Sequence, residues 1–182
     1  DTMVLPDVPA TVFEGEAEMA LVIGRTATNV PAERWSDYVF GYINFIDGSA
    51  RGLAPGFYQM KSRDTFAPIG PFLVTKDEIA DPQELPIKLW VNGVLKQDFN
   101  TNDMAHKIPR CIEWVSHIHD LLPGDILATG TNHRDYATMH NLLKGADTMK
   151  HRCTPRGGAS NEQQEFLEEY EEFCLETEDQ KG

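Results

Sequence analysis

The chain has 182 residues, of which 41% are hydrophobic and 25% charged, a composition that excludes a disordered or fibrous protein and suits one compact domain. No apolar run approaches the roughly 20 residues that cross a bilayer, so no membrane partner is expected. The formal net charge is −13, but residues 162–179 hold nine acids and no base. This leaves 20 acidic and 16 basic residues elsewhere, a balance that does not favour a nucleic-acid partner.

The first part of the chain predicts two extended segments and a helix. Residues 1–10 favour an extended lead-in, because their prolines disfavour a helix. Residues 16–23 begin with alternating polarity and end as an apolar run before Gly24, which predicts a strand that enters a core. A helix that runs into Asp47 is predicted over residues 33–46, because apolar residues recur there at helical spacing: Trp35, Val39, Tyr42, Ile43 and Ile46.

The middle of the chain predicts a hairpin, a helix and a short strand. Two β-rich runs within residues 87–97 flank Asn92-Gly93, which is the strongest hairpin signal in the sequence. Residues 105–122 place their apolar side chains on one helical face and are followed by Pro123-Gly124, which stops a helix. Residues 126–128 predict a short buried strand. Because strands outnumber helices and do not alternate regularly with them, the predicted fold class is α+β, mainly β.

The end of the chain differs in character. The run from Lys150 to Gly158 predicts a polar loop in place of a closing strand. An acidic amphipathic helix is predicted after it, with an apolar face that packs on the domain or on a partner: Phe166, Leu167, Tyr170, Phe173 and Cys174. We therefore divide the chain into a core of residues 1–149 and a divergent end of residues 150–182.

The first residues that could carry chemistry are Glu16 and Glu18. In a strand, residues two positions apart point to the same face, so the two carboxylates lie side by side. Two anions at this spacing repel each other near a core unless they share a cation, which is the reason to suspect a metal. The alternative is that both face solvent on a half-buried strand, where Glu-x-Glu is common.

Asp47 adds a third carboxylate where the predicted helix ends, and Arg51 follows four residues later. An aspartate at the end of a buried element, beside an arginine that binds anions, is a reasonable third oxygen ligand. Asp-Gly is also ordinary turn chemistry, so a plain turn is the alternative.

Several segments of the chain resemble the fumarylacetoacetate hydrolase family in order and spacing over about residues 11–131. The segments are Glu16-Ala17-Glu18 with Val22-Ile23-Gly24, Asp37-Tyr38-Val39 and Gly41-Tyr42, Asp47-x-Ser49-Ala50-Arg51, Lys61-Ser62-x-Asp64-Thr65-Phe66, Pro68-Ile69-Gly70-Pro71, Val91-Asn92-Gly93, Gln97 with Asn100-Thr101, and Pro123-Gly124-Asp125-Ile126-Leu127-x-Thr129-Gly130-Thr131. Asp64-Thr65-Phe66 and Thr131-Asn132-His133 are most similar to the isomerase/decarboxylase branch, which handles 2-hydroxy-diene-dioates in aromatic degradation.

This resemblance implies a fold, an assembly and a cofactor. The expected fold is a mixed β-sandwich roll of the family's C-terminal-domain type, usually dimeric. The expected cofactor is a divalent cation, Mg²⁺, Mn²⁺ or Ca²⁺, held by three carboxylates. Glu16, Glu18 and Asp47 match those ligands.

The resemblance also implies three substrate-binding residues. Lys61 matches a lysine near the substrate, Arg51 stands where a substrate-facing arginine lies, and Thr131 matches a threonine beside the substrate carboxylate. Lys61 and Arg51 are the expected catalytic residues, because their charges would offset negative charge on a carboxylate and an enolate. A 2-oxo acid or 1,3-diketone can chelate a hard cation through two oxygens, which suits an all-carboxylate ligand set.

The chain departs from the family pattern at three places. Family members usually begin some sixty or more residues earlier, with a lid segment whose histidine acts as general base, so no residue here is assigned that role. His133 is a candidate replacement, with an ordinary loop histidine as the alternative. A glutamine that the family often carries three residues beyond the arginine is Ala54 here, and Lys150 onwards does not continue the family's closing strand.

The predicted function is a divalent-metal enzyme that isomerises, decarboxylates or hydrolyses a small 2-oxo acid, 1,3-diketo acid or 2-hydroxy-diene-dioate through a metal-bound enolate. The resemblance implies a homodimer. A cytoplasmic location is expected separately, because the three scattered cysteines indicate a reducing compartment. The alternative is a non-catalytic scaffold or ligand-binding subunit that keeps the fold and metal but lacks the lid.

Overall fold

The computed structural model describes residues 2–53, 56–132, 148–153 and 172–177, and this part of the chain is mainly β, as predicted. The strands are β1 (Thr2–Leu5), β2 (Val12–Ile23), β3 (Val39–Arg51), β4 (Ile69–Thr75), β5 (Pro86–Val91), β6 (Val94–Asn100), β7 (Ile126–Ala128), β8 (Thr148–Cys153) and β9 (Glu172–Thr177). The helices are α1 (Phe57–Lys61), α2 (Ile108–Ile118) and four short 3₁₀ segments, η1 (Ala32–Asp37), η2 (Lys76–Glu78), η3 (Pro82–Glu84) and η4 (Thr101–Asp103). None of the described helices is long and apolar enough to cross a membrane.

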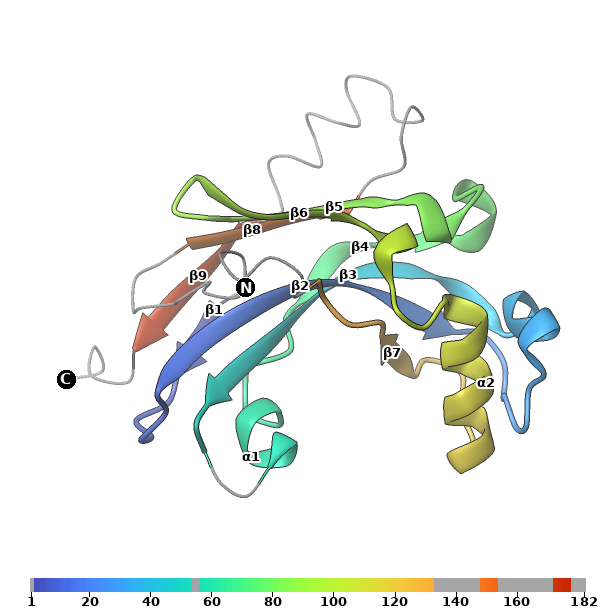
Figure 1. Cartoon of the computed structure of the whole chain (residues 1–182), viewed down its shortest axis with the longest axis horizontal. Helices are drawn as coiled ribbons and strands as arrows, with labels where there is room; N and C mark the ends of the chain where they lie inside the picture. The colour runs from blue at the N-terminus through green and yellow to red at the C-terminus, as the bar shows by residue number, and fades with distance from the viewer. Residues whose placement is uncertain (1, 54–55, 133–147, 154–171, 178–182) are drawn as a thin grey trace.

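The strands form two sheets that pack against each other (Figure 1). One sheet has the order β1-β9-β8-β5-β6 and the other the order β4-β3-β2-β7. The core holds Met19 and Leu21 from β2 together with Ile87 and Leu89 from β5, all at most 1% exposed. Burying a side chain of this size contributes about 1.5–3 kcal/mol, so these layers account for much of the driving force for folding.

Most of the predicted elements in the middle of the chain are confirmed. β2 contains the predicted strand, and β5 and β6 form the predicted hairpin. β7 coincides with the strand predicted at residues 126–128, but the prediction that it is buried is wrong, because Ile126 and Ala128 are exposed at the edge of the sheet. Both turn residues, Asn92 (φ 51°) and Gly93 (φ 75°), are left-handed, which is the backbone that a tight hairpin turn requires.

The predicted helix over residues 105–122 is confirmed with tighter bounds. Pro109 lies in the first turn of α2 and fixes its start at Ile108, since proline is tolerated only at the beginning of a helix. The helix stops at Ile118, before the expected Pro123-Gly124 signal, because Leu121 leaves the helix to form a β-bridge with Ala27.

The helix predicted over residues 33–46 is wrong. The structure has only the short η1 there, followed by β3, which pairs antiparallel with β2 along nearly its whole length. The segment from Val39 to Ile46 is rich in β-branched and aromatic residues, and long-range pairing with β2 decides between the two readings. β4 packs on its other edge so closely that a Cβ on Gly41 would lie 2.3 Å from the carbonyl oxygen of Val74.

The predictions for the end of the chain are wrong where the structure describes it. Residues 150–153 belong to β8, which pairs antiparallel with β5, and not to a loop. Residues 172–177 form β9, which pairs with β8 and runs parallel to β1, and not a helix. The reason is that β1 and β5 offer sheet edges that local periodicity cannot report. Residues 154–171 and 178–182, with the remainder of the predicted loop and helix, lie outside the described residues.

Candidate metal centre

Strand β2 is buried on both faces. Successive side chains along it point to opposite faces, so most of its large apolar residues lie on one face and its glutamates on the other. Ala17, Met19 and Leu21 point into the apolar core. The intervening residues Glu16 and Glu18 therefore point to the opposite face, and both are almost completely buried, with 5% and 3% exposure. The solvent-facing alternative for this glutamate pair is thus excluded.

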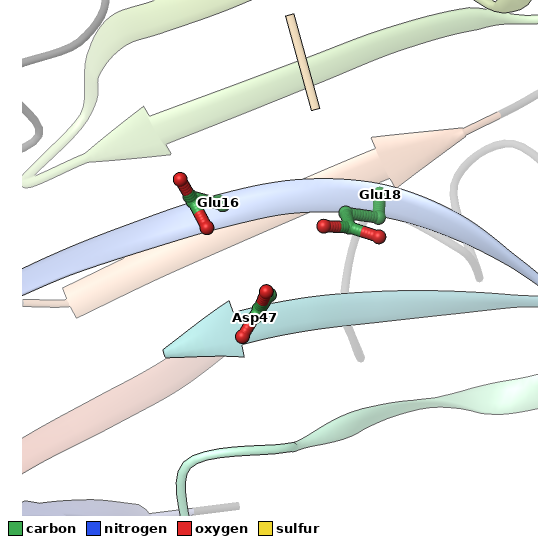
Figure 2. A group of neighbouring side chains, drawn as sticks. All are labelled: Glu16, Glu18 and Asp47. Carbon is green, nitrogen blue, oxygen red and sulfur yellow. The ribbon is translucent and has the colours of Figure 1, made fainter. Parts of the chain in front are cut away.

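Asp47 joins the two glutamates through the pairing of β2 with β3. It is the direct antiparallel partner of Glu16, and one carboxylate oxygen from each of the three acids lies within 4.8 Å of the others. Figure 2 shows Glu16 and Glu18 on β2 and Asp47 on the neighbouring β3. Because the wrongly predicted helix is a strand, Asp47 lies within a sheet and not after a helix, which fixes its distance from Glu16.

Burial raises the pKa of two of the three carboxyl groups, those of Glu18 and Asp47. Burial is the main reason that the pKa of Glu18 rises to about 8, and the negative charges of Asp47 and Glu16 add to it. The backbone N–H of Gly130 donates to Glu18 Oε2 at 2.7 Å and opposes the shift. Burial also raises the pKa of Asp47, against the effect of Lys61. Three acids held this way fit a divalent cation. The cation would displace the protons from the carboxyl groups, and carboxylate oxygens are ligands that such a cation binds well.

Lys61 and Arg51 surround the acids with positive charge. The ammonium group of Lys61, at the end of α1, donates both to Glu16 and to Asp47 Oδ2, the latter at 2.5 Å. The guanidinium of Arg51, at the end of β3, donates to Glu14 Oε2 and Glu16 Oε1, both at 2.5 Å. The two cations predicted from the sequence therefore contact the same glutamate of the cluster.

Glu14 is a site residue that the sequence reasoning missed. It is 8% exposed and holds the Nε of Arg51, which orients the guanidinium toward Glu16. The signal was available, because Glu14 continues the same period-two series as Glu16 and Glu18.

Thr131 follows the loop residue Gly130, which binds Glu18, and so lies beside the cluster. Gly130 and Thr131 line a cavity of about 480 Å³ together with Asn100, Asp103 and His106. Gln97 of β6, 3% exposed, donates from Nε2 to Thr131 Oγ1 at 2.8 Å. The sequence placed Gln97 among the segments that resemble the family but predicted no role for it. The predicted residues Ala54 and His133 lie outside the described part of the chain.

Comparison with known proteins gives a consistent family. The sequence profile of the fumarylacetoacetate (FAA) hydrolase C-terminal family matches residues 1–163. The chain is 48% identical over 123 residues to an uncharacterized protein of Pyrococcus abyssi, covering 64% of this chain and 54% of that protein. It is 43% identical over 116 residues to the maleylpyruvate hydrolase of Aquipseudomonas alcaligenes, covering 64% of this chain and 40% of that protein.

A third relative is the 4-hydroxyphenylacetate degradation bifunctional isomerase/decarboxylase of Salmonella dublin, with 40% identity over 120 residues, covering 64% of this chain and 28% of that protein. The chain thus spans about half the length, or less, of the curated relatives it matches.

The fold is similar to the crystal structure of maleylpyruvate hydrolase from Sphingobium sp. SYK-6 in complex with manganese(II) and pyruvate. The TM-score is 0.80 and the identity 33%, and the match covers 97% of this chain and 59% of that one.

Proposed function

Because the chain belongs to the fumarylacetoacetate hydrolase C-terminal family, we propose that it is the metal-binding core of an enzyme that acts on a small 2-oxo acid, 1,3-diketo acid or 2-hydroxy-diene-dioate. Glu16, Glu18 and Asp47 would hold the divalent cation. The proposal rests on one observation above all, the three carboxylates with oxygen atoms within 4.8 Å of one another, two of them buried. Such a cluster is costly to keep in a core without a cation to share.

The class of substrate is supported by the relatives. Maleylpyruvate hydrolase and the bifunctional isomerase/decarboxylase are named for small oxo acids and aromatic degradation, and a related structure holds manganese(II) and pyruvate. Mg²⁺ and Mn²⁺ are the cations that we propose for this chain, since both accept an all-oxygen ligand set. Isomerisation, decarboxylation and carbon–carbon hydrolysis are all within reach of this site.

When bound, the cation would polarise the carbonyl oxygen of the oxo acid and offset negative charge that develops on the substrate. The protein's own groups do the rest of the work. The ammonium of Lys61 keeps Glu16 and Asp47 together with two of its three N–H donors and offers the third to an anionic substrate. Gly130 N–H fixes the carboxylate of Glu18. The guanidinium of Arg51 holds Glu16 from the other side and adds positive charge to the site.

We also propose the finer features that the family implies. The two packed sheets would form the mixed β-sandwich roll. Residues 1–149, which contain all the proposed ligands, would be the catalytic core, and β8 and β9 complete its five-stranded sheet beyond residue 149. Exposed apolar side chains on and after α2, Trp114, Ile118 and Leu122, are available for a homodimer. A cytoplasmic location stays a prediction from the cysteine content. Light scattering of the purified chain tests the dimer, which a monomeric mass would exclude.

Calorimetric titration with Mn²⁺ and Mg²⁺, with and without oxalate as an enolate mimic, tests the proposed function. Glu18→Gln keeps the shape of the side chain but removes a ligand charge, and Glu78→Gln, at an exposed position in η2, is the matched control. We expect saturable binding that only Glu18→Gln loses and that oxalate tightens. Metal binding without a response to oxalate would favour the alternative, a metal-binding scaffold without turnover. Unchanged binding by Glu18→Gln would exclude the ligand assignment.

A further inference from the structure

The side chain of Gln97 connects the carboxylate cluster with the loop that carries Thr131. It extends from β6, in the opposite sheet, and is 3% exposed. Its Oε1 accepts from the backbone N–H of Ala17 at 3.0 Å, and its Nε2 donates to Thr131 Oγ1 at 2.8 Å. Both ends of one buried amide are thus engaged, one by the backbone of β2 and the other by Thr131.

The orientation of this amide follows from its partners. A backbone N–H can only donate, so the atom of Gln97 that faces Ala17 must be the carbonyl oxygen. The NH₂ group is therefore directed to Thr131, whose hydroxyl oxygen accepts. An ambiguity that normally affects glutamine side chains is removed here by the main chain of β2.

The same geometry explains why Ala17 needs such a partner. β3 lies on one side of β2 and pairs with it throughout, whereas within the described residues β7 pairs with the other side only from Ala20 to Val22. The N–H of Ala17 lies beyond this short pairing, and an unpaired buried N–H is unfavourable by about 1–3 kcal/mol. Gln97 occupies the position that a longer β7 would have filled.

A consequence for Thr131 follows from the chemistry of a hydroxyl group. A hydroxyl has one hydrogen to donate and lone pairs to accept with. Because Thr131 Oγ1 already accepts from Gln97, whose NH₂ offers no acceptor, the hydrogen of Thr131 points elsewhere. Thr131 lines a cavity together with Gly130, whose N–H binds Glu18, and the hydroxyl hydrogen can be directed to an anion bound in that cavity.

We propose that Gln97 is a positioning residue that makes the Thr131 hydroxyl a hydrogen-bond donor toward the carboxylate of the bound oxo acid. The hydrogen bonds then run in one direction, from Ala17 N–H to Gln97, from Gln97 to Thr131, and from Thr131 to the ligand. This inference rests on the proposed function, since it needs an anionic ligand beside the cluster.

Gln97→Glu reverses the direction of this chain with almost no change in shape. A carboxylate at position 97 still accepts from Ala17 but has no N–H for Thr131, so the Thr131 hydroxyl would donate to it and present only lone pairs to the cavity. We expect the affinity of the Mn²⁺-loaded chain for oxalate to fall about 10- to 100-fold, the range for a lost hydrogen bond to a charged group.

The added negative charge would also weaken oxalate binding, and the Thr131→Val background separates the two effects. If Gln97 acts through the hydroxyl, Gln97→Glu lowers oxalate affinity much less in Thr131→Val than in the wild type. If charge repulsion or a general structural role is responsible, the loss is equal in both backgrounds and the inference is overturned. Thr131→Ser, which keeps the hydroxyl, should bind oxalate nearly as the wild type does.

The experiment is calorimetric titration of oxalate into the Mn²⁺-loaded chain, with a separate Mn²⁺ titration and a thermal unfolding curve for each variant. If Gln97→Glu does not fold, Gln97→Met replaces it. Its oxalate affinity should fall about 3- to 10-fold, because the Thr131 hydroxyl then has no fixed direction. This loss of affinity should again disappear in the Thr131→Val background. Oxalate affinity unchanged in both Gln97 variants overturns the inference alone. Failure of the wild type to bind oxalate overturns the proposed function, and the inference with it.

Discussion

Replacing Glu18 by glutamine is expected to stabilise the metal-free chain, and to do so much more at pH 8 than at pH 5. The wild-type carboxyl has a pKa of about 8 in the folded chain, mainly because it is buried, against 4.5 when unfolded. Glutamine has the same shape and can still accept from Gly130 N–H, but it never ionises. The variant therefore removes the penalty of a buried negative charge and leaves the fold intact.

The sign and size of this effect follow from proton linkage. Between pH 4.5 and 8 the folded wild type binds more protons than the unfolded chain, so its stability falls as the pH rises through this window. Below the window both states are protonated, and above it both are ionised, so the contribution of Glu18 is flat. Relative to a pH at which both states are protonated, Glu18 lowers the free energy of unfolding of the wild type by about 1 kcal/mol at pH 5 and by about 4 kcal/mol at pH 8. The difference between the two pH values is therefore about 3 kcal/mol.

Urea unfolding in the presence of EDTA, followed by tryptophan fluorescence at pH 5 and pH 8, measures this difference. The urea midpoint of Glu18→Gln should exceed that of the wild type at both pH values. For an m-value of about 1–3 kcal/mol/M, this difference in midpoint should be about 1–3 M larger at pH 8 than at pH 5. Glu78→Gln, at an exposed position, should show no such growth. An equal gap between wild type and Glu18→Gln at both pH values would refute the reasoning that burial makes Glu18 retain its proton.

Three further perturbations give predictions for the carboxylate cluster and for the packing of β3 on β4. Binding of one Mn²⁺ at pH 7 should release about one proton, because Glu18 is then mostly protonated, and calorimetry in buffers of different ionisation enthalpy measures it. Lys61→Met should destabilise the metal-free chain by about 1–3 kcal/mol in urea, because Glu16 and Asp47 lose their shared cation. The same variant should bind Mn²⁺ about tenfold more tightly in a calorimetric titration, because the ammonium no longer competes. Gly41→Ala should cost about 1–3 kcal/mol in urea, since its Cβ would meet the Val74 carbonyl.

Each of these predictions has an outcome that contradicts it. Proton release near zero at pH 7 would mean that Glu18 is already ionised in the metal-free chain. Weaker Mn²⁺ binding by Lys61→Met would mean that the lysine organises the ligands more than it competes with the cation. Gly41→Ala with wild-type stability would mean that β4 can withdraw from β3 without loss.

The site was predictable from the sequence to the extent that it depends on local geometry. Period two in an extended chain is enough to place Glu16 and Glu18 on one face, and Asn92-Gly93 is enough to turn a hairpin. The apolar face of residues 105–122 likewise predicts a helix, and α2 (Ile108–Ile118) lies within that range. In each case the deciding interactions lie within a few residues, so the pattern in the chain and the structure in space agree.

The predictions failed where distant segments compete. The apolar spacing of residues 33–46 suits a helix, yet β2 and β4 offer hydrogen-bonding edges on both sides, and β3 forms between them. The glutamates among residues 172–177 suggested an acidic helix, yet the backbone pairs with β1 and β8. Strand pairing depends on what lies alongside, and a single sequence does not contain that information in local form.

By itself the sequence determined which side chains were available and which of them share a face of β2. Only the tertiary structure decided that Asp47 stands opposite Glu16, that Glu14 holds Arg51 against the cluster, and that Gln97 reaches across from the other sheet to Thr131. The physical reason is that charges and hydrogen bonds act over a few ångströms of space, whatever the separation along the chain. The register of β2 on β3 converts residues 31 positions apart into one site.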